Sequence, residues 1–197
     1  MIKKNHKGMN VKMDRKRILW ITQTAIFIAL LVSAQIFTRP LGQLVTGSSV
    51  NFILVTACLL FGLPSAATVG VVSPVLAYMI TGRPFFPVLI PFVMLGNVAL
   101  VAAVHLIFGK SYVNTGRFCY VRAAAAVLTG SALKFLVLWI GIVQIALNFI
   151  PDIGPPQVEA MTLAFSWPQL VTALIGSALA MAVAPYLVRA LRSVRRF

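Results

Sequence analysis

The stretch ILWITQTAIFIALLVSAQIFT, which runs from Ile18 to Thr38, decides the class of this protein. None of its 21 residues is charged. At about 1.5 Å per residue, a helix of this length crosses a hydrocarbon core of about 30 Å. The run is too long for the apolar part of a signal peptide, and further apolar runs follow it. We therefore predict a retained transmembrane helix.

The composition of the whole chain agrees with this prediction. Of its 197 residues, 60% are hydrophobic and only 10% are charged, and the mean hydropathy is +0.95. A soluble domain of this size carries charge on about a quarter of its residues. The sequence therefore predicts an integral membrane protein whose length suits one compact domain.

Five further apolar runs follow, at positions 50–62, 65–81, 86–109, 121–150 and 168–191. Pro151, Pro155 and Pro156 predict a loop between the last two runs. We expect an all-α bundle of six transmembrane helices over residues 18–197, preceded by a basic cytoplasmic tail at 1–17. The second run has only 13 residues and predicts a short helix. Pro74 should bend or break the third helix, which a bundle tolerates when neighbouring groups satisfy the freed carbonyl.

The charges predict the orientation. The chain has 17 Lys and Arg against 3 Asp and Glu, a net charge of +14. Six spans place 14 of the basic residues inside and 2 outside, with one left within a span, as the positive-inside rule requires. We expect a multi-pass protein of the cell membrane with both termini cytoplasmic. Basic clusters at both ends favour contact with anionic membrane lipid and not with nucleic acid.

Polar residues inside the spans are few, and Lys134 is the most conspicuous. A lysine at mid-membrane costs about 2.5–3.5 kcal/mol on insertion scales, so it needs a partner or a wet cavity. Two roles fit it equally. It can receive an anionic group of a ligand, or it can be structural, either paired with protein carbonyls and polar side chains or snorkelling inward from a shifted span. Gly141, Gln144 and Asn148 fall on the same helical face and predict a polar stripe that rises to the outer surface.

Other polar residues sit near the outer ends of the predicted spans. Gln35 and Arg39 adjoin a Gly/Ser/Thr-rich segment at 42–49, which reads as an outer loop. Together with the stripe they predict an outward-facing pocket with amide and cationic donors and few carboxylates, suited to a small polar molecule, including an anionic one. The candidate substrate-binding residues are Gln35, Arg39, Asn97, Lys134, Gln144, Asn148, Trp167 and Gln169.

Signatures of catalysis are missing from the sequence. It has no nucleophile–base pair, no paired carboxylates and no metal-ligand spacing, so we expect neither an enzyme nor a cofactor or metal site. Gly109-Lys110-Ser111 resembles the end of a phosphate-binding loop, but Val104 stands where the earlier glycine must be. If ATP drives this protein, the ATPase must be another chain.

Small residues four positions apart mark one face of the first span. Ala25, Ala29 and Ser33 share that face, and small residues permit the close backbone approach on which helix association in lipid depends. The face either packs within this bundle or docks a partner.

Taken together, these features resemble those of the substrate-binding S components of energy-coupling factor (ECF) transporters. The resemblance covers the chain from about Arg15 onward. It rests on the size, the six spans, the basic start, the Ala25-xxx-Ala29 pattern, and the segments Ser49–Leu54, Leu59–Pro64, Gly70–Pro74, Pro87–Asn97 and Trp167–Gly176. It implies capture of a vitamin or similar micronutrient at the outer face. It also implies docking of Ala25, Ala29 and Ser33 onto a transmembrane coupling subunit that two cytoplasmic ATPases drive.

Two other functions remain open from the residues alone. A stand-alone secondary carrier or channel for a small solute is the main alternative, although the predicted spans contain no acidic residue for proton coupling. A membrane enzyme or assembly factor acting on lipid would have to use His105 with Lys110, which is a poor catalytic pair.

Overall fold

The structure is a computed structural model that describes residues 3–82, 86–109, 118–151 and 153–194, with side chains described between positions 15 and 190. In these ranges the chain is almost entirely helical and contains no β-strand. The α-helices within these ranges are α1 (Lys3–Thr38), α2 (Gln43–Phe61), α3 (Leu63–Thr81), α4 (Ile90–Val104), α6 (Tyr120–Leu138), α7 (Pro155–Ala164) and α8 (Trp167–Val194).

Short helical segments of other kinds extend several of these helices. Three are 3-10 turns, η1 (Arg39–Leu41), η2 (Pro87–Leu89) and η5 (Ala146–Phe149). Two are π-helical, η3 (His105–Gly109) and η4 (Trp139–Ile145).

Six helical segments are long and apolar enough to cross a membrane, which confirms the predicted all-α bundle of six spans. They are Arg15–Leu41, Gln43–Phe61, Leu63–Thr81, Pro87–Gly109, Tyr120–Phe149 and Pro155–Ala190. Large apolar side chains such as Phe37, Met79 and Leu128 are more than half exposed on the bundle surface. An apolar outer surface is what a lipid solvent requires. The chain is therefore a multi-pass membrane protein.

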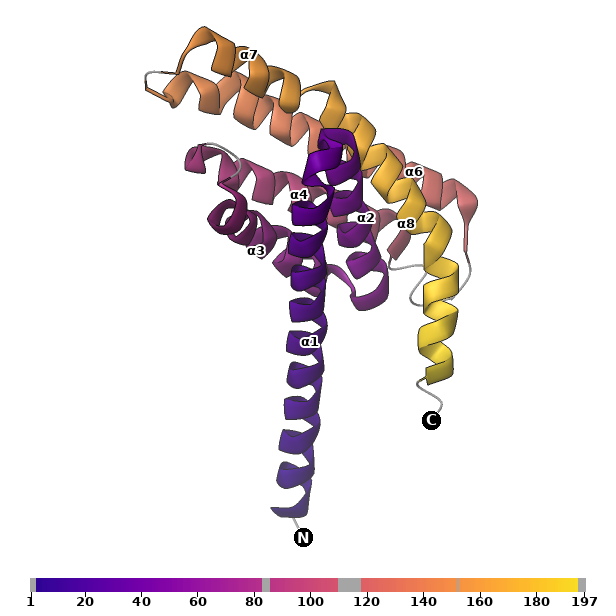
Figure 1. The fold of residues 1–197 in the computed structure, drawn as a ribbon. Helices are drawn as coiled ribbons and strands as arrows, with labels where there is room; N and C mark the ends of the chain where they lie inside the picture. Colours follow the sequence, from indigo (N-terminus) through magenta and orange to yellow (C-terminus); the bar gives the residue numbers. More distant parts are fainter. Residues whose placement is uncertain (1–2, 83–85, 110–117, 152, 195–197) are drawn as a thin grey trace.

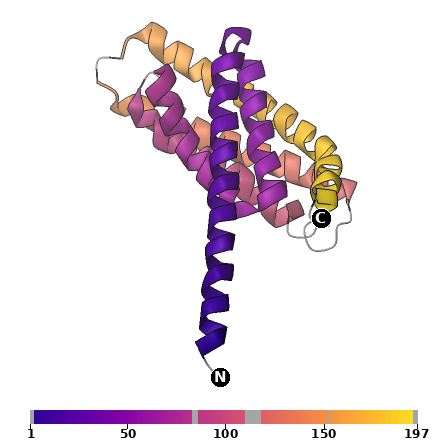
Figure 2. The same ribbon diagram turned by 60° about the horizontal axis from the view of Figure 1, so that its bottom comes forward.

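The start of α1 and the end of α8 lie at the same end of the bundle (Figure 1). Helix α1 begins at Lys3, so the basic start of the chain continues the first span as helix. Its N-terminal part projects well beyond the other helices in both views (Figures 1 and 2). The segment η1 and helix α7 lie at the opposite end (Figure 1).

The second span is a full-length helix, so the predicted short helix is wrong. Helix α2 has 19 residues and begins at Gln43, within the segment expected to be a loop. Its hydroxyl groups bond to carbonyls one turn back, Thr46 to Gly42 O at 3.0 Å and Ser49 to Val45 O at 2.9 Å. Because these hydroxyls are satisfied within the helix, polar residues are compatible with a membrane-spanning segment.

Glycines hold α2 against α8, which packs on it along much of its length. A side chain at Gly176 would bring its Cβ within 2.7 Å of the Asn51 Cβ, and one at Gly47 within 2.9 Å of the Thr172 side chain. These two glycines let the helices approach more closely than larger residues would allow.

Two further predictions about the spans need correction. Helix α3 continues from Leu63 to Thr81 without a break at Pro74. The segment before the sixth span, expected to be a loop because of its prolines, forms helix α7. Pro155 occupies the first helical position, where a missing N–H costs nothing, and the Gly154 N–H donates to Gln157 Oε1 at 3.2 Å.

Two hydrophobic clusters form the interior. The larger contains Leu54, Leu100 and Phe108 and joins α1, α2, α3, α4, η3, α6 and α8. The smaller contains Leu138 and Met161 and joins η2, α6, η4, η5 and α7. Polar groups and a cavity lie where these clusters meet.

Candidate substrate-binding site

A cavity of about 320 Å³ lies among the helices and carries many polar groups on its wall. It draws residues from α1, α2, α3, α4, α6, α7 and α8, so every span contributes to it. Its size falls in the range of pockets for small ligands. Its polar lining residues are Gln35, Arg39, Gln43, Thr46, Asn51, Thr81, Asn97, Lys134 and Gln169, and its main apolar ones are Val50, Pro74, Ala77, Val93, Leu138, Met161 and Phe165.

Lys134 lies in the wall of this cavity and is only 4% exposed. Its Nζ donates to Asn51 Oδ1 at 2.6 Å and to Asn97 Oδ1 at 2.7 Å. These short distances are typical of hydrogen bonds from a charged donor. The structure is therefore compatible with both roles considered for Lys134, because the lysine is paired with two side chains and also borders the cavity.

Pro74 explains why Asn97 faces Lys134. A proline has no N–H, so in helix α3 the carbonyl of Gly70, four residues earlier, loses its helical partner. Asn97 Nδ2 donates to this carbonyl at 3.1 Å. Gly70 permits the approach, since a Cβ there would lie 3.1 Å from the Asn97 Cβ. With its amide nitrogen fixed on α3, Asn97 turns its oxygen toward Lys134.

This set of bonds joins four helices around the cavity. Asn51 belongs to α2, Gly70 to α3, Asn97 to α4 and Lys134 to α6. The expectation that neighbouring groups satisfy the carbonyl freed by Pro74 is thus confirmed, and α3 stays continuous for that reason.

Five of the eight candidate residues come together at the cavity, namely Gln35, Arg39, Asn97, Lys134 and Gln169. Gln35 Oε1 is buried, and no described residue donates to it. Arg39 lies at the exposed end of α1, where its Nη1 donates to Thr81 O at 3.2 Å. The other three candidates lie elsewhere.

The stripe predicted along the fifth span does not persist. Gly141 is buried, but Gln144 and Asn148 are exposed, and Asn148 Nδ2 donates to the Gln144 carbonyl at 2.7 Å. The π-helical segment η4 begins directly after Leu138; it contains Gly141 and Gln144 and precedes Asn148. Its wider turns change which positions share a face, so an extrapolation at 3.6 residues per turn fails there.

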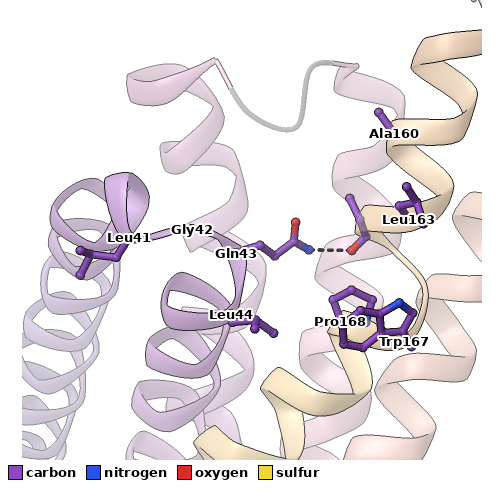
Figure 3. A pocket seen from close by; sticks show the side chains of 9 residues that line it. Leu41, Gly42, Gln43, Leu44, Ala160, Leu163, Trp167 and Pro168 are labelled. Atoms are coloured by element: carbon purple, nitrogen blue, oxygen red, sulfur yellow. Dashed lines mark hydrogen bonds between the residues drawn. The ribbon is translucent and has the colours of Figure 1, made fainter.

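Trp167 lines a second, more open hollow of about 450 Å³ beside the cavity. Figure 3 shows this hollow between the start of α2 and the junction of α7 with α8. Gly42, Gln43 and Ala164 border both spaces. Gln43 Nε2 donates to Ala164 O at 2.6 Å across the hollow (Figure 3), and Gln169 Nε2 donates to the same carbonyl at 3.1 Å.

Two residues that shape the cavity were not predicted from the sequence. Asn51 accepts from Lys134, and Gln43 ties α2 to the end of α7. Asn51 could have been predicted, since a polar residue within an apolar run needs a partner in the membrane. Gln43 could not, because its segment was predicted to be a loop.

The site offers hydrogen-bond donors and positive charge but no described carboxylate. Within the described parts of the chain, no three or more His, Cys, Asp or Glu residues gather as metal ligands would. Such a wall can bind and orient a small polar molecule. Comparison with protein-family models, with curated proteins and with solved structures finds no match.

Proposed function

We propose that this chain is the membrane-embedded substrate-binding subunit of an ECF-type importer. It captures a vitamin or similar small micronutrient at the outer face and has no catalytic role of its own. A transmembrane coupling subunit and two cytoplasmic ATPases supply the energy.

The cavity is the observation that carries this proposal. Five polar residues chosen from the sequence line one hollow to which every span contributes. Its bordering residues Arg39, Gly42 and Gln43 belong to the end of the bundle opposite the start of α1 and the end of α8 (Figure 1). The strong excess of basic residues on the terminal side supports a cytoplasmic position for that side by the positive-inside rule. The cavity then faces outward at the cell membrane.

The exposed face of α1 supports the proposal that a protein partner docks there. In the most apolar window of the first span only 17% of residues are buried, against 39–44% in the other five spans. Ala25, Ala29 and Ser33 are all exposed on α1. A face of small residues permits a second protein to bring its backbone close, as docking onto a coupling subunit requires.

Transport measured with and without the partners tests the proposal. Ala25→Leu with Ala29→Leu should abolish ATP-dependent uptake, because bulky side chains block docking, while ligand binding to the purified subunit persists. Leu128→Ala, a change of one exposed apolar residue on α6, serves as a surface control that keeps uptake. Equal loss of binding and uptake in the double variant would refute the docking face.

The same preparation separates an importer subunit from a stand-alone carrier. Vesicles that contain this chain alone should not accumulate solute when an ion gradient is applied. Accumulation under those conditions would contradict the proposal.

A further inference from the structure

Lys134 has no carboxylate partner among the described residues. Its two partners, Asn51 and Asn97, are neutral amides. The chain contains only three acidic residues, and the one whose side chain is described, Glu159, is exposed on α7 and does not line the cavity. A buried cation that is solvated only by amides gains strongly from an anion placed beside it.

The ammonium also has donor capacity left over. A lysine carries three N–H donors, and the described contacts use two of them. The third is available to a group in the cavity that Lys134 borders. One remaining donor suits a single carboxylate better than a phosphate ester, whose three terminal oxygens and charge near −2 demand more donors.

The second cation of the cavity, Arg39, lines it at a different level of the bundle. From Gln43, near the mouth, to Asn51, beside Lys134, α2 rises about 12 Å. Arg39 is exposed near the mouth and Lys134 is buried near the floor. Arg39 therefore attracts an entering anion over a distance, and Lys134 holds it.

We propose that the ligand of this cavity is a small monoanion whose carboxylate seats against Lys134. This inference rests on the proposed capture function and names its substrate class. The body of the ligand lies against Leu138, Met161 and Phe165 and offers an N–H or O–H to the unpaired Gln35 Oε1. The cavity volume corresponds to about ten water molecules, so the ligand is a compact molecule. Cations are repelled by both basic residues.

The test compares carboxylates with uncharged counterparts of the same shape. The probes are nicotinate with nicotinamide, pantothenate with panthenol, and biotin with its primary amide, each measured by thermal shift and titration on the purified chain. Any probe that binds should be a carboxylate, with affinity at least about tenfold above that of its uncharged counterpart, because a charge-assisted bond is lost in the latter.

Variants assign the preference to one residue. Lys134→Met should remove the preference for the carboxylate, and Lys134→Arg should keep it. Arg189→Gln removes the same charge from an exposed position on α8 outside the cavity and should change neither affinity. If Lys134→Met does not fold, the comparison of probe pairs on the unaltered chain still tests whether the cavity prefers a carboxylate.

The outcomes separate this inference from the function on which it rests. An uncharged or cationic molecule that binds in the cavity, or equal affinity for both members of a pair, would overturn the anion assignment and leave nutrient capture standing. Failure of every probe, together with a purified chain that carries no small molecule, would remove nutrient capture and this inference with it.

Discussion

The bond network around Asn97 makes a quantitative prediction about stability. Asn97→Ala removes the acceptor of Lys134 and the donor to the Gly70 carbonyl. A hydrogen bond to a charged group contributes about 1.5–3 kcal/mol and a neutral one about 0.5–1.5 kcal/mol. We expect a loss of about 2–4.5 kcal/mol, which lowers the melting temperature by about 4–18 °C for a chain of this length. Asn51→Ala removes only the bond to Lys134 and should cost less.

Pro74 provides a sharper form of the same test. In a Pro74→Ala background the Gly70 carbonyl regains an N–H partner within helix α3. The additional cost of Asn97→Ala should then fall by about 1 kcal/mol, because one of its two bonds no longer satisfies an orphaned group. A cost that does not change between the two backgrounds would refute the assigned role of Asn97.

The chain carries its own reporter for these measurements. Cys58 is fully buried on α2 and reacts with a thiol dye only when the bundle opens. Cys119 is exposed, so Cys119→Ser removes the background signal. Asn148→Ala is the matched control, since its amide is exposed and bonds only to the Gln144 carbonyl one turn back. This control should melt with the parent, and an equal loss in it would contradict the reasoning.

Three further predictions concern helix packing, ligand access and topology. Gly176→Leu should lower the melting temperature, with a loss of about 1–3 kcal/mol or more, because the new side chain collides with Asn51. Gly154→Ala should not, because the nearest neighbour of the added Cβ lies at 3.8 Å. Gln43→Leu removes the bond to the end of α7 and should speed both ligand entry and release in stopped-flow experiments, while unchanged rates would rule out a restraining bond. Cys119 should react with a membrane-impermeant maleimide in inside-out vesicles and not in intact cells; the reverse pattern would invert the proposed topology.

The six spans were predictable from the sequence because apolar length decides them. The boundaries were harder, since Gln43–Ser49 looks like a loop by composition. Its hydroxyls find their partners one turn back, as Thr46 and Ser49 show, and composition does not display such bonds. Helix α7 had a readable signal in the Gly154-Pro155 start, but adjacent prolines favoured a loop.

The site was predictable where the helix period stayed regular. Asn97 and Lys134 meet at the cavity, as polar residues at mid-depth should. Gln144 and Asn148 do not, because the helix becomes π-helical in η4, which contains Gln144 and precedes Asn148. The residue types of that segment do not indicate a π turn. The contact between Pro74 and Asn97 through Gly70 depends on helix packing and needed the structure.

Native mass spectrometry of the chain, purified in mild detergent from cells grown in rich medium, tests the central claim most directly. We predict one additional small mass per chain, released on unfolding and identified as a compact carboxylic acid, and absent when Lys134→Met is purified in the same way. Detection of the chain only at its unliganded mass, with no mass gained from any added vitamin, would contradict nutrient capture.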